Sequence, residues 1–437
     1  MKVLWFSLTP SNYPAKSRGA NGGGWISSLE SCVSGRGDVE LGVAFFHDSA
    51  AGKRRIGPVT YYPIRRPHSP LAKAVRFFGI SGQDRLELGL CKEVVADFRP
   101  DVIHVFGTEG SFGLLAGETA VPVVIHLQGL MGPCLDAWVP PGYRMLDYAV
   151  RGSLDPRKIA LGLRAIAFNR HSAEREREIM RLCKAFIGRT EWDRTFVSQY
   201  APHARYFACW ETLRPCFYEP VKWIPPARPV FVSTISSPLY KGHDMILKTA
   251  RTLRDSGLSD FEWRVFGVAD MRFAERKTGI RAADAGVRPM GVASATELRD
   301  ALCGASAYVH PSYIENSPNS VCEAQMLGVP VVATNVGGVA SLFSPDKWHC
   351  MVPANDPLAA SSRILAALAE PEKFISDREA CRARHSPEII GEKLTRIWAE
   401  VAAIPPSSSR PPPATATSSA TAKSSRSPST STSKSPS

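Results

Sequence analysis

The first part of the chain alternates short apolar runs with longer segments in which apolar residues recur at helical spacing. The apolar runs, which we expect to form strands, are Lys2–Leu8, Val39–Phe46, Asp101–Phe106, Val121–His126 and Ala185–Gly188. The longer segments, which we expect to form helices, are Gly24–Val33, Arg85–Phe98, Phe112–Glu118 and Arg157–Lys184. Strands that alternate with helices are typical of parallel β-sheets covered by helices, so an α/β fold is predicted.

The same alternation starts again after a proline-rich stretch between residues 220 and 229. The strands expected there are Pro229–Ile235, Trp263–Phe266, Ala307–Val309 and Val331–Ala333, and the helices are Gly242–Leu253, Ser294–Ala305 and one that begins near Ser320. A chain of 437 residues is long enough for two domains. We assign residues 1–220 to the first domain and residues 221–386 to the second.

The end of the chain has a different composition. From residue 404 onward the residues are nearly all Pro, Ser, Thr, Ala, Lys and Arg. Such a segment cannot bury enough apolar surface to offset its conformational entropy, so residues 404–437 are predicted to be disordered. A last helix, Pro387–Ala402, is expected just before this tail.

Composition narrows the location of the protein. The chain is 44% hydrophobic but has no apolar run near the roughly 20 residues that a membrane helix needs. The run at Met1–Leu8 is too short for a signal-peptide core and fits a first strand better. The ten cysteines are scattered and form no Cys-x-x-Cys pair, which favours a reduced cytoplasmic protein without a zinc site.

The net charge of +12 leaves two kinds of partner open. A basic chain suits phosphate-bearing substrates or the anionic inner face of a membrane, to which the protein would bind peripherally. No nucleic-acid-binding motif is present, so nucleic acid is not expected as a partner. The helix near Lys158–Lys184 is basic and amphipathic; packing on its own domain is favoured over a membrane-surface role.

Polar clusters follow the ends of the predicted strands. They are Gly107-Thr-Glu, His126-Leu-Gln-Gly, Gly188-Arg-Thr-Glu, Lys241-Gly242 and Glu315. Ligands of open α/β sheets bind at the carboxyl ends of the strands, so these clusters are candidates for one site. Polar loops also occur at strand ends without any function.

The stretch from His310 to Gly338 is the most informative one. Glu315 and Glu323 flank the start of a predicted helix, whose first N–H groups have no partner in the helix and attract anions such as a diphosphate. Taken alone, Ser320-x-x-Glu323 is also a capping-box pattern, which would make Glu323 a helix cap. Glu315 taken alone would be a solvated loop acid.

Two further features bear on phosphate binding. Gly22, Gly23 and Gly24 precede a helix, but they come too late after the first strand for a dinucleotide fingerprint, which argues against a dehydrogenase. Lys241 opposes the dipole of the helix that it precedes, and a bound diphosphate would remove that conflict. No Asp-x-Asp pair is present, so we expect neither a metal nor another cofactor.

Residues 310–338 closely resemble the donor-binding region of retaining GT-B glycosyltransferases, in the group marked by two glutamates at this spacing. The matching positions are the two acids, Pro311-Ser312, Glu323-Ala324, Gly328, Pro330 and Gly337-Gly338. The resemblance implies two Rossmann-like parallel-sheet domains that face a cleft. It also implies that Glu315 contacts the donor sugar, that Asn319 and Ser320 lie near phosphate, and that Glu323 binds the ribose.

The resemblance implies roles for residues elsewhere in the chain. His126 falls where the family often has a histidine facing the transferred sugar, and Gly23 and Gly24 fall at a glycine pair near the acceptor and the diphosphate. Lys241 would hold the leaving diphosphate. The family's partner arginine is replaced here by Ser236.

Three more residues complete the expected donor site. Arg189 is our candidate for the cation that substitutes for the missing arginine. Gly267 and Gly338 are expected to contribute backbone contacts to the donor. The last helix, within residues 387–403, is expected to pack back on the first domain.

The implied reaction transfers a hexose from a nucleoside diphosphate sugar to an acceptor hydroxyl, with retention at the anomeric carbon. The acceptor would be a saccharide or a lipid-linked saccharide, since the resemblance is to enzymes of bacterial capsule and surface polysaccharide synthesis. Two alternatives stay open: a nucleotide-sugar epimerase or sugar phosphorylase with the same fold, and a non-catalytic partner subunit, because of Ser236.

Overall fold

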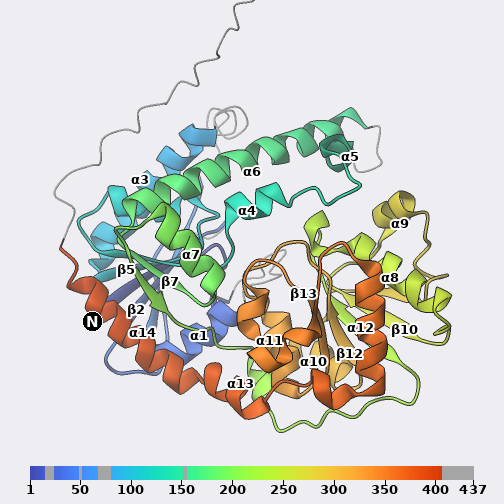
Figure 1. The fold of residues 1–437 in the computed structure, drawn as a ribbon. Coiled ribbons are helices and arrows are strands. Elements are labelled where there is room, and N and C mark those ends of the chain that lie inside the picture. Colours follow the sequence, from blue (N-terminus) through green and yellow to red (C-terminus); the bar gives the residue numbers. More distant parts are fainter. Residues whose placement is uncertain (15–23, 49–51, 67–79, 151–154, 406–437) are drawn as a thin grey trace, which may run out of the picture. The chain divides into compact units, whose positions relative to one another are not determined.

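The structure, a computed structural model, describes residues 1–14, 24–48, 52–66, 80–150 and 155–405. It contains two β-sheets covered by helices (Figure 1). The strands of the first sheet are β1 (Lys2–Phe6), β2 (Glu40–Phe46), β3 (Arg54–Ile56), β4 (Val59–Ile64), β5 (Val102–Phe106), β6 (Val123–His126), β7 (Ala185–Gly188) and β8 (Arg205–Ala208). Their order is β3-β4-β2-β1-β5-β6-β7-β8, and the pairs are parallel except β3 with β4.

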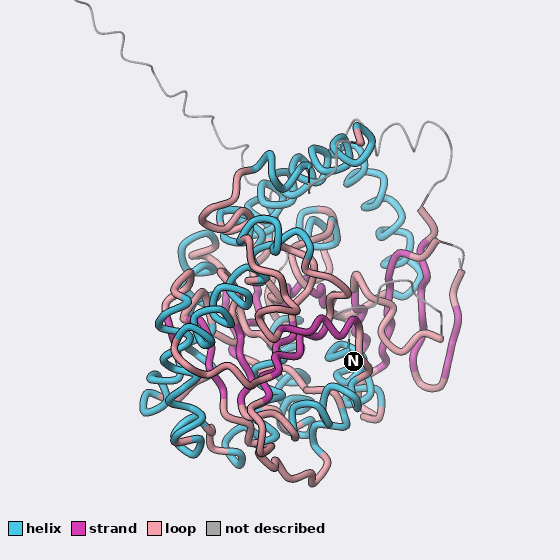
Figure 2. The backbone as a smooth tube through the Cα atoms, turned by 90° about the vertical axis from the view of Figure 1, so that its right-hand side faces the viewer, coloured by secondary structure: helices cyan, strands magenta, loops and turns pink. Residues whose placement is uncertain are grey.

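Helices cover both faces of this sheet (Figure 2). The helices in this part of the chain are α1 (Gly24–Ser34), α3 (Ile80–Phe98), α4 (Met131–Asp136), α5 (Met145–Val150), α6 (Pro156–Leu182) and α7 (Glu191–Tyr200), with 3-10 turns η1 (Ser111–Gly117) and η2 (Pro215–Tyr218). Of these, α5 packs on α6 rather than on the sheet, and η2 packs in the core of the second sheet. Alternate side chains of β1 enter opposite layers, as a pleated strand requires. Val3 and Trp5 pack with α1, whereas Leu4 and Phe6 pack with residues of α3 and α6.

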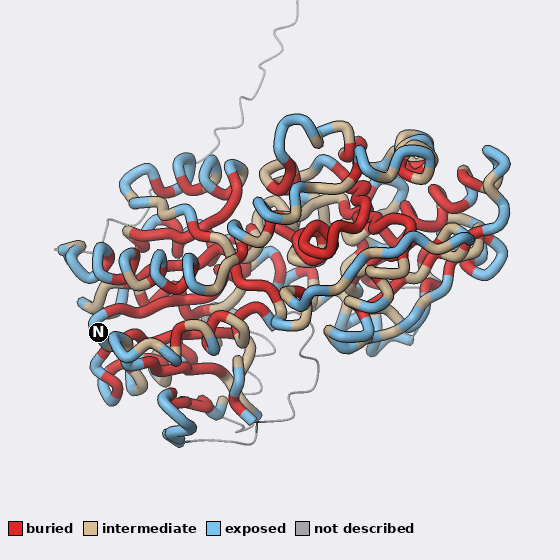
Figure 3. The backbone as a smooth tube through the Cα atoms, turned by 90° about the horizontal axis from the view of Figure 1, so that it is seen from below, coloured by how far each residue is buried: buried red, intermediate tan, exposed pale blue. Residues whose placement is uncertain are grey.

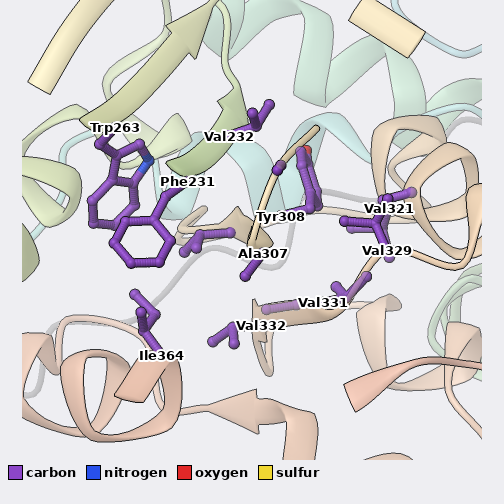
Figure 4. Packing of buried hydrophobic residues seen from close by; sticks show 14 of the residues in the cluster. Phe231, Val232, Trp263, Ala307, Tyr308, Val321, Val329, Val331, Val332 and Ile364 are labelled. Carbon is purple, nitrogen blue, oxygen red and sulfur yellow. The ribbon is translucent and has the colours of Figure 1, made fainter. Parts of the chain in front are cut away.

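The second sheet is parallel throughout its described pairs. Its strands are β9 (Val230–Thr234), β10 (Glu262–Phe266), β11 (Val287–Gly291), β12 (Ala307–His310), β13 (Val331–Thr334) and β14 (Met351–Val352), in the order β11-β10-β9-β12-β13-β14. The core includes Phe231, Trp263, Tyr308 and Val332 (Figure 4). Burial on both faces explains the continuous apolar runs of these strands.

Most helices of the second sheet carry both buried and exposed residues, whereas the helix Asn319–Leu327 has no exposed residue (Figure 3). The helices of this sheet are α8 (His243–Asp255), α9 (Arg272–Thr278), α10 (Ala295–Cys303), α11 (Asn319–Leu327), α12 (Pro357–Ala369) and α13 (Arg378–Arg384), with 3-10 turns η3 (Leu239–Lys241), η4 (Val339–Leu342), η5 (Pro345–Cys350) and η6 (Pro371–Phe374). The prediction of an α/β fold with two parallel-sheet, Rossmann-like domains is confirmed.

The last helix, α14 (Pro387–Ala402), lies against the first sheet although it follows the second in sequence (Figure 1). Ile390, Leu394, Ile397, Trp398 and Val401 are buried in the same cluster as Val3 and Trp5. α14 also contacts α1 and β5. Side chains of α14, such as Trp398, therefore contact the central strands of the first sheet.

The sequence missed some elements and misjudged one. The strands β3, β4, β8, β11 and β14 were not expected, and Phe112–Glu118 is a 3-10 helix, η1, rather than an α-helix. β4 contains Pro63, which signals against a strand in the interior of a sheet. β8 is only partly buried and lacks a clear alternation of buried and exposed residues. Within the described ranges, no helix is long and apolar enough to cross a membrane.

Candidate active site

Glu323 is buried on α11 and pairs with Arg214 from the segment before η2. The Nε and Nη2 atoms of Arg214 donate to Oε1 and Oε2 of Glu323, each over 2.7 Å. This two-point geometry fixes both side chains and is among the stronger hydrogen-bonded pairs in proteins. Burial raises the pKa of Glu323, and the bonds and charge of Arg214 pull it back down.

The capping-box interpretation of Glu323 is wrong. α11 begins at Asn319, its N-cap position is Pro318, and no side chain caps it. The hydroxyl of Ser320 accepts a hydrogen bond from the Tyr308 hydroxyl at 2.7 Å, while the Glu323 carboxylate is bonded to Arg214. The carboxylate is therefore held by a distant part of the chain and not by its own helix start.

The first amides of α11 lie between the two glutamates. The amides of Val321 and Cys322 already bond the carbonyl of Pro318, at 3.0 and 3.4 Å. The amides of Asn319 and Ser320 precede these first bonds of the helix, at its positive end. Both residues are half-buried. Their predicted role near phosphate remains a prediction.

Lys241 and Glu315 form a second pair. The Nζ of Lys241 lies 2.8 and 2.6 Å from the two carboxylate oxygens of Glu315, and both side chains are partly accessible. Gly242, in the left-handed region with φ of +83°, allows the close approach, because a Cβ there would lie 2.2 Å from the carbonyl oxygen of Pro311. The loop after β9 is thus pressed against the loop that carries Glu315.

Gly337 and Gly338 pack against the same loop. The amide of Gly338 donates to the carbonyl of Glu315 at 3.0 Å. A Cβ on Gly337 would lie 2.0 Å from that carbonyl oxygen, and one on Gly338 would lie 2.4 Å from the carbonyl oxygen of Asn316. The observed role of the glycine pair is to shape the loop of Glu315, since the amide of Gly338 is already bonded.

Gly24 connects the first domain to the Glu323 pair. A Cβ on Gly24 would lie 3.2 Å from Cδ of Arg214, so the start of α1 runs close beside this arginine. Gly23 lies outside the described residues. Arg214 was not among the candidates from the sequence, because a lone arginine before a proline belongs to no motif.

Arg189 lies elsewhere than beside Lys241. It is buried at the end of β7, forms an ion pair with Glu211, and its Nη2 approaches the carbonyl of Gln128 at 3.5 Å. Burial lowers the pKa of the Arg189 guanidinium. These partners belong to the first domain, so the idea that Arg189 replaces the missing arginine has no contact to support it.

Gly267 directly follows β10. With φ of +94°, it is a position where any Cβ would lie 2.1 Å from the carbonyl oxygen of Ile235. Its amide donates to the carbonyl of Gly291 at 2.7 Å, and the amide of Gly291 donates to Val268. The amide of Gly267 is therefore already used inside the sheet, and any backbone contact to a nucleotide would come from its carbonyl.

His126 ends β6 and is fully buried. Its Nδ1 lies 3.2 Å from Nε2 of His104, and its Nε2 has no hydrogen-bond partner among the described residues. Burial lowers the pKa of His126 well below its ordinary value, and His104 and Arg189 lower it further. His126 is therefore a neutral imidazole at physiological pH.

Asn316 connects the carboxyl ends of the two sheets. Its Nδ2 donates to Asp193 Oδ2 and to the carbonyl of Gln128, both at 3.1 Å, and its Oδ1 accepts from the hydroxyl of Thr190 at 2.8 Å. Gln128 follows β6, Thr190 follows β7, and Asn316 follows β12. The strand ends that carry His126 and Glu315 therefore meet at one place in the molecule.

The comparisons with known proteins agree with this fold. Residues 227–370 match the family model described as "Glycosyl transferases group 1". A Bacillus subtilis protein, TuaC, named as a teichuronic acid biosynthesis glycosyltransferase, is 41% identical over 68 residues, which are 16% of this chain and 17% of TuaC. The D-inositol 3-phosphate glycosyltransferase of Streptomyces scabiei is 31% identical over 105 residues, 24% of this chain and 23% of the relative. The matched segments span less than a quarter of these relatives.

Solved structures resemble almost the whole described chain. Sucrose-phosphate synthase from Thermosynechococcus elongatus has a TM-score of 0.68 at 15% identity, over 92% of this chain and 98% of its own. HepE from Anabaena, in complex with UDP and glucose, has a TM-score of 0.58 at 14% identity, over 92% of this chain and 100% of its own. The chain thus has the GT-B fold of glycosyltransferases, and its residues 227–370 match the group 1 glycosyl transferase family.

Proposed function

We propose that this protein is a retaining glycosyltransferase that moves a hexose from a nucleoside diphosphate sugar to an acceptor hydroxyl. The observation that carries the proposal is the arrangement around the start of α11. Two carboxylates, Glu315 and Glu323, flank its first amides, and each is already paired with a cation, Lys241 or Arg214. Such an arrangement suits a ligand with hydroxyls at both ends and negative charge between them.

The nucleotide end of the donor is assigned to Glu323. A carboxylate accepts hydrogen bonds from neighbouring hydroxyls, as a ribose presents them. Arg214 keeps Glu323 oriented and favours its charged form despite burial. In this proposal Arg214 also adds a positive charge to the site, in which Ser236 stands where the family has an arginine.

The diphosphate is assigned to Lys241 and the amides of Asn319 and Ser320. On donor binding, Lys241 would share its charge between Glu315 and the phosphate oxygens. In the reaction the bond from the anomeric carbon to the diphosphate oxygen breaks, and the bond to the acceptor oxygen forms on the same face. The released diphosphate oxygen takes the acceptor proton, so no protein nucleophile is needed. Lys241 stabilises the charge that develops on the leaving group.

The sugar end is assigned to Glu315 and His126, which lie at the carboxyl ends of the two sheets. Glu315 would accept from donor hydroxyls and keep Lys241 in place. The carboxyl edges are joined through Asn316, which supports a single site built from both sheets. We further propose a saccharide or lipid-linked saccharide acceptor, since relatives are named for teichuronic acid and colanic acid biosynthesis.

A panel of UDP-, GDP- and ADP-hexoses tests the proposal. With a mixed saccharide acceptor, the wild type should release nucleotide from one donor class, and NMR of the product should show the anomeric configuration of the donor. Glu315→Gln should lose turnover, whereas Glu392→Gln on the exposed face of α14 should not. An epimerised donor in the absence of acceptor would indicate an epimerase, and turnover that requires phosphate would indicate a sugar phosphorylase. Donor binding without turnover would indicate a non-catalytic partner subunit.

A further inference from the structure

Three aromatic rings form a hydrogen-bonded line across the first domain. The indole Nε1 of Trp398 on α14 donates to Nδ1 of His104 on β5 at 3.1 Å. The Nε2 of His104 lies 3.2 Å from Nδ1 of His126 on β6. All three side chains are fully buried. The line begins in the last helix and ends at the strand end that carries His126.

The chemistry of the first ring sets the proton positions in the other two. An indole N–H can only donate, so Nδ1 of His104 must be the acceptor. A neutral His104 then carries its proton on Nε2 and donates it to Nδ1 of His126. His126, neutral in turn, carries its own proton on Nε2. Burial supports the neutral state of both rings, since it lowers the pKa of His104 to about 3 and that of His126 well below its ordinary value.

The last member of the line is a buried donor without a partner. Nε2 of His126 is inaccessible and has no hydrogen-bond partner among the described residues. Buried polar groups are nearly always paired, so an unpaired one calls for an explanation, such as a catalytic role or a bound water or ion. The ring of Trp25 at the start of α1 packs edge-on against His126, with ring centres 5.3 Å apart. Trp25 follows Gly24, which borders Arg214 of the proposed donor site.

We propose that Trp398 and His104 are positioning residues that hold His126 in the Nε2–H form, so that it donates to an oxygen of the bound sugar. That the sugar accepts this hydrogen bond rests on the proposed function, whereas the tautomer of His126 does not depend on it. The reverse polarity would put a proton on Nδ1 of His104, pointing at the indole N–H. Without the indole, that clash disappears and His126 can take the Nδ1–H form, which leaves only an acceptor at Nε2.

The tautomers are read directly by NMR of the full-length protein with ¹⁵N-labelled histidine at neutral pH. His104→Asn and His126→Asn variants assign the signals. In the wild type, both rings should carry the proton on Nε2 and none on Nδ1. A wild-type His126 protonated on Nδ1 overturns the proposal, whatever any variant does.

Trp398→Phe then removes the donor and keeps an aromatic ring. The proton of His126 should redistribute toward Nδ1, and KM for the donor sugar nucleotide should rise about two- to tenfold, the effect of one lost neutral hydrogen bond. Trp263→Phe is the matched control, since it removes a buried indole N–H that donates to Ser233 at 3.0 Å in the other domain. It should leave the His126 signals unchanged.

Two results separate this inference from the proposed function. If the His126 signals do not change in Trp398→Phe and the enzyme transfers hexose, the positioning role of Trp398 and His104 is wrong and the proposed function stands. If the tautomers are as expected but the protein binds no sugar nucleotide, the positioning of His126 is supported and the donor sugar is not its ligand.

Discussion

At the scale of single residues, the site consists of two opposite-charge pairs that differ in burial. Glu323 is almost wholly buried and depends on Arg214, whereas Glu315 and Lys241 are both partly accessible. Removing one partner of a buried ion pair leaves the other charge buried and unpaired. The resulting loss in the free energy of unfolding is larger than the net contribution of the intact pair. The first pair should therefore affect stability, and the second mainly function.

Arg214→Met should lower the free energy of unfolding by about 2–4 kcal/mol, because Glu323 stays buried without a partner. Urea denaturation measures the loss. The double variant Arg214→Met/Glu323→Met should recover most of the stability but not nucleotide binding. Equal stability of the wild type and the Arg214→Met variant would show that Glu323 does not need the arginine.

Glu109 predicts a pH dependence of stability. Burial, with the charge of Glu176 adding to it, raises the pKa of Glu109 from its ordinary value of 4.5 to about 7. Below pH 4.5 the carboxyl is protonated in both states. Between pH 4.5 and 7 the folded state binds the proton and the unfolded state does not, so stability falls as pH rises through this window.

Glu109→Gln should remove this dependence. From pH 5 to 7.5 the wild type should lose up to about 3 kcal/mol of stability relative to the variant, as measured by urea denaturation at each pH. The same slope in both proteins would mean that Glu109 titrates normally in the folded state.

At the scale of elements, the buried strands were the easiest to predict. β1, β5, β7, β9, β12 and β13 are short apolar runs in the sequence because parallel strands are buried on both faces. β8 was missed because its residues are half-exposed and carry no such run. Local pattern therefore identifies core strands and leaves edge strands unrecognised.

The residues of the proposed site were predictable only where the resemblance offers a matching position. Glu315, Asn319, Ser320 and Glu323 share a loop and a helix start, and the resemblance named them together. Arg214 bonds Glu323 across 109 residues of sequence, and no local pattern signals that contact. The same holds for Trp398 and His104, which are 294 residues apart. Contacts between residues that are far apart in the sequence can be identified only once the fold is known.

The helix α6 presents an apolar and basic face near its start. Leu161 and Phe168 are exposed on one side of the helix, and Arg157 and Lys158 lie on the same side. This combination suits an anionic lipid surface. The carboxyl-terminal half of α6 instead packs on its own domain through Ile179 and Met180.

Leu161→Glu/Phe168→Glu should therefore reduce co-sedimentation with vesicles that contain phosphatidylglycerol, and should leave activity on a water-soluble acceptor unchanged. Leu358→Glu, an exposed leucine on α12, is the control. Vesicle binding that is the same in all three proteins would rule out this face.

At the scale of the whole molecule, function depends on elements that come from distant parts of the chain. Asn316 joins the carboxyl ends of the two sheets, Arg214 bonds Glu323 of α11 across 109 residues of sequence, and α14 returns to the first sheet. The proposed ligand site therefore draws on residues of both sheets.

Since Lys241, Arg214 and the α11 amides supply the positive charge for the diphosphate in this account, a metal ion is not required. Hexose transfer should continue after dialysis against EDTA. Activity that disappears on chelation and returns with Mg²⁺ or Mn²⁺ would contradict this.

Calorimetric titration measures the proposed contact between Glu323 and the nucleotide of the donor. A nucleoside diphosphate that binds the wild type should bind Glu323→Ala at least about tenfold more weakly, because hydrogen bonds from hydroxyls to a charged group are lost. Glu392→Ala on α14 should bind like the wild type. Equal affinity of the wild type and Glu323→Ala would mean that Glu323 does not bind the nucleotide.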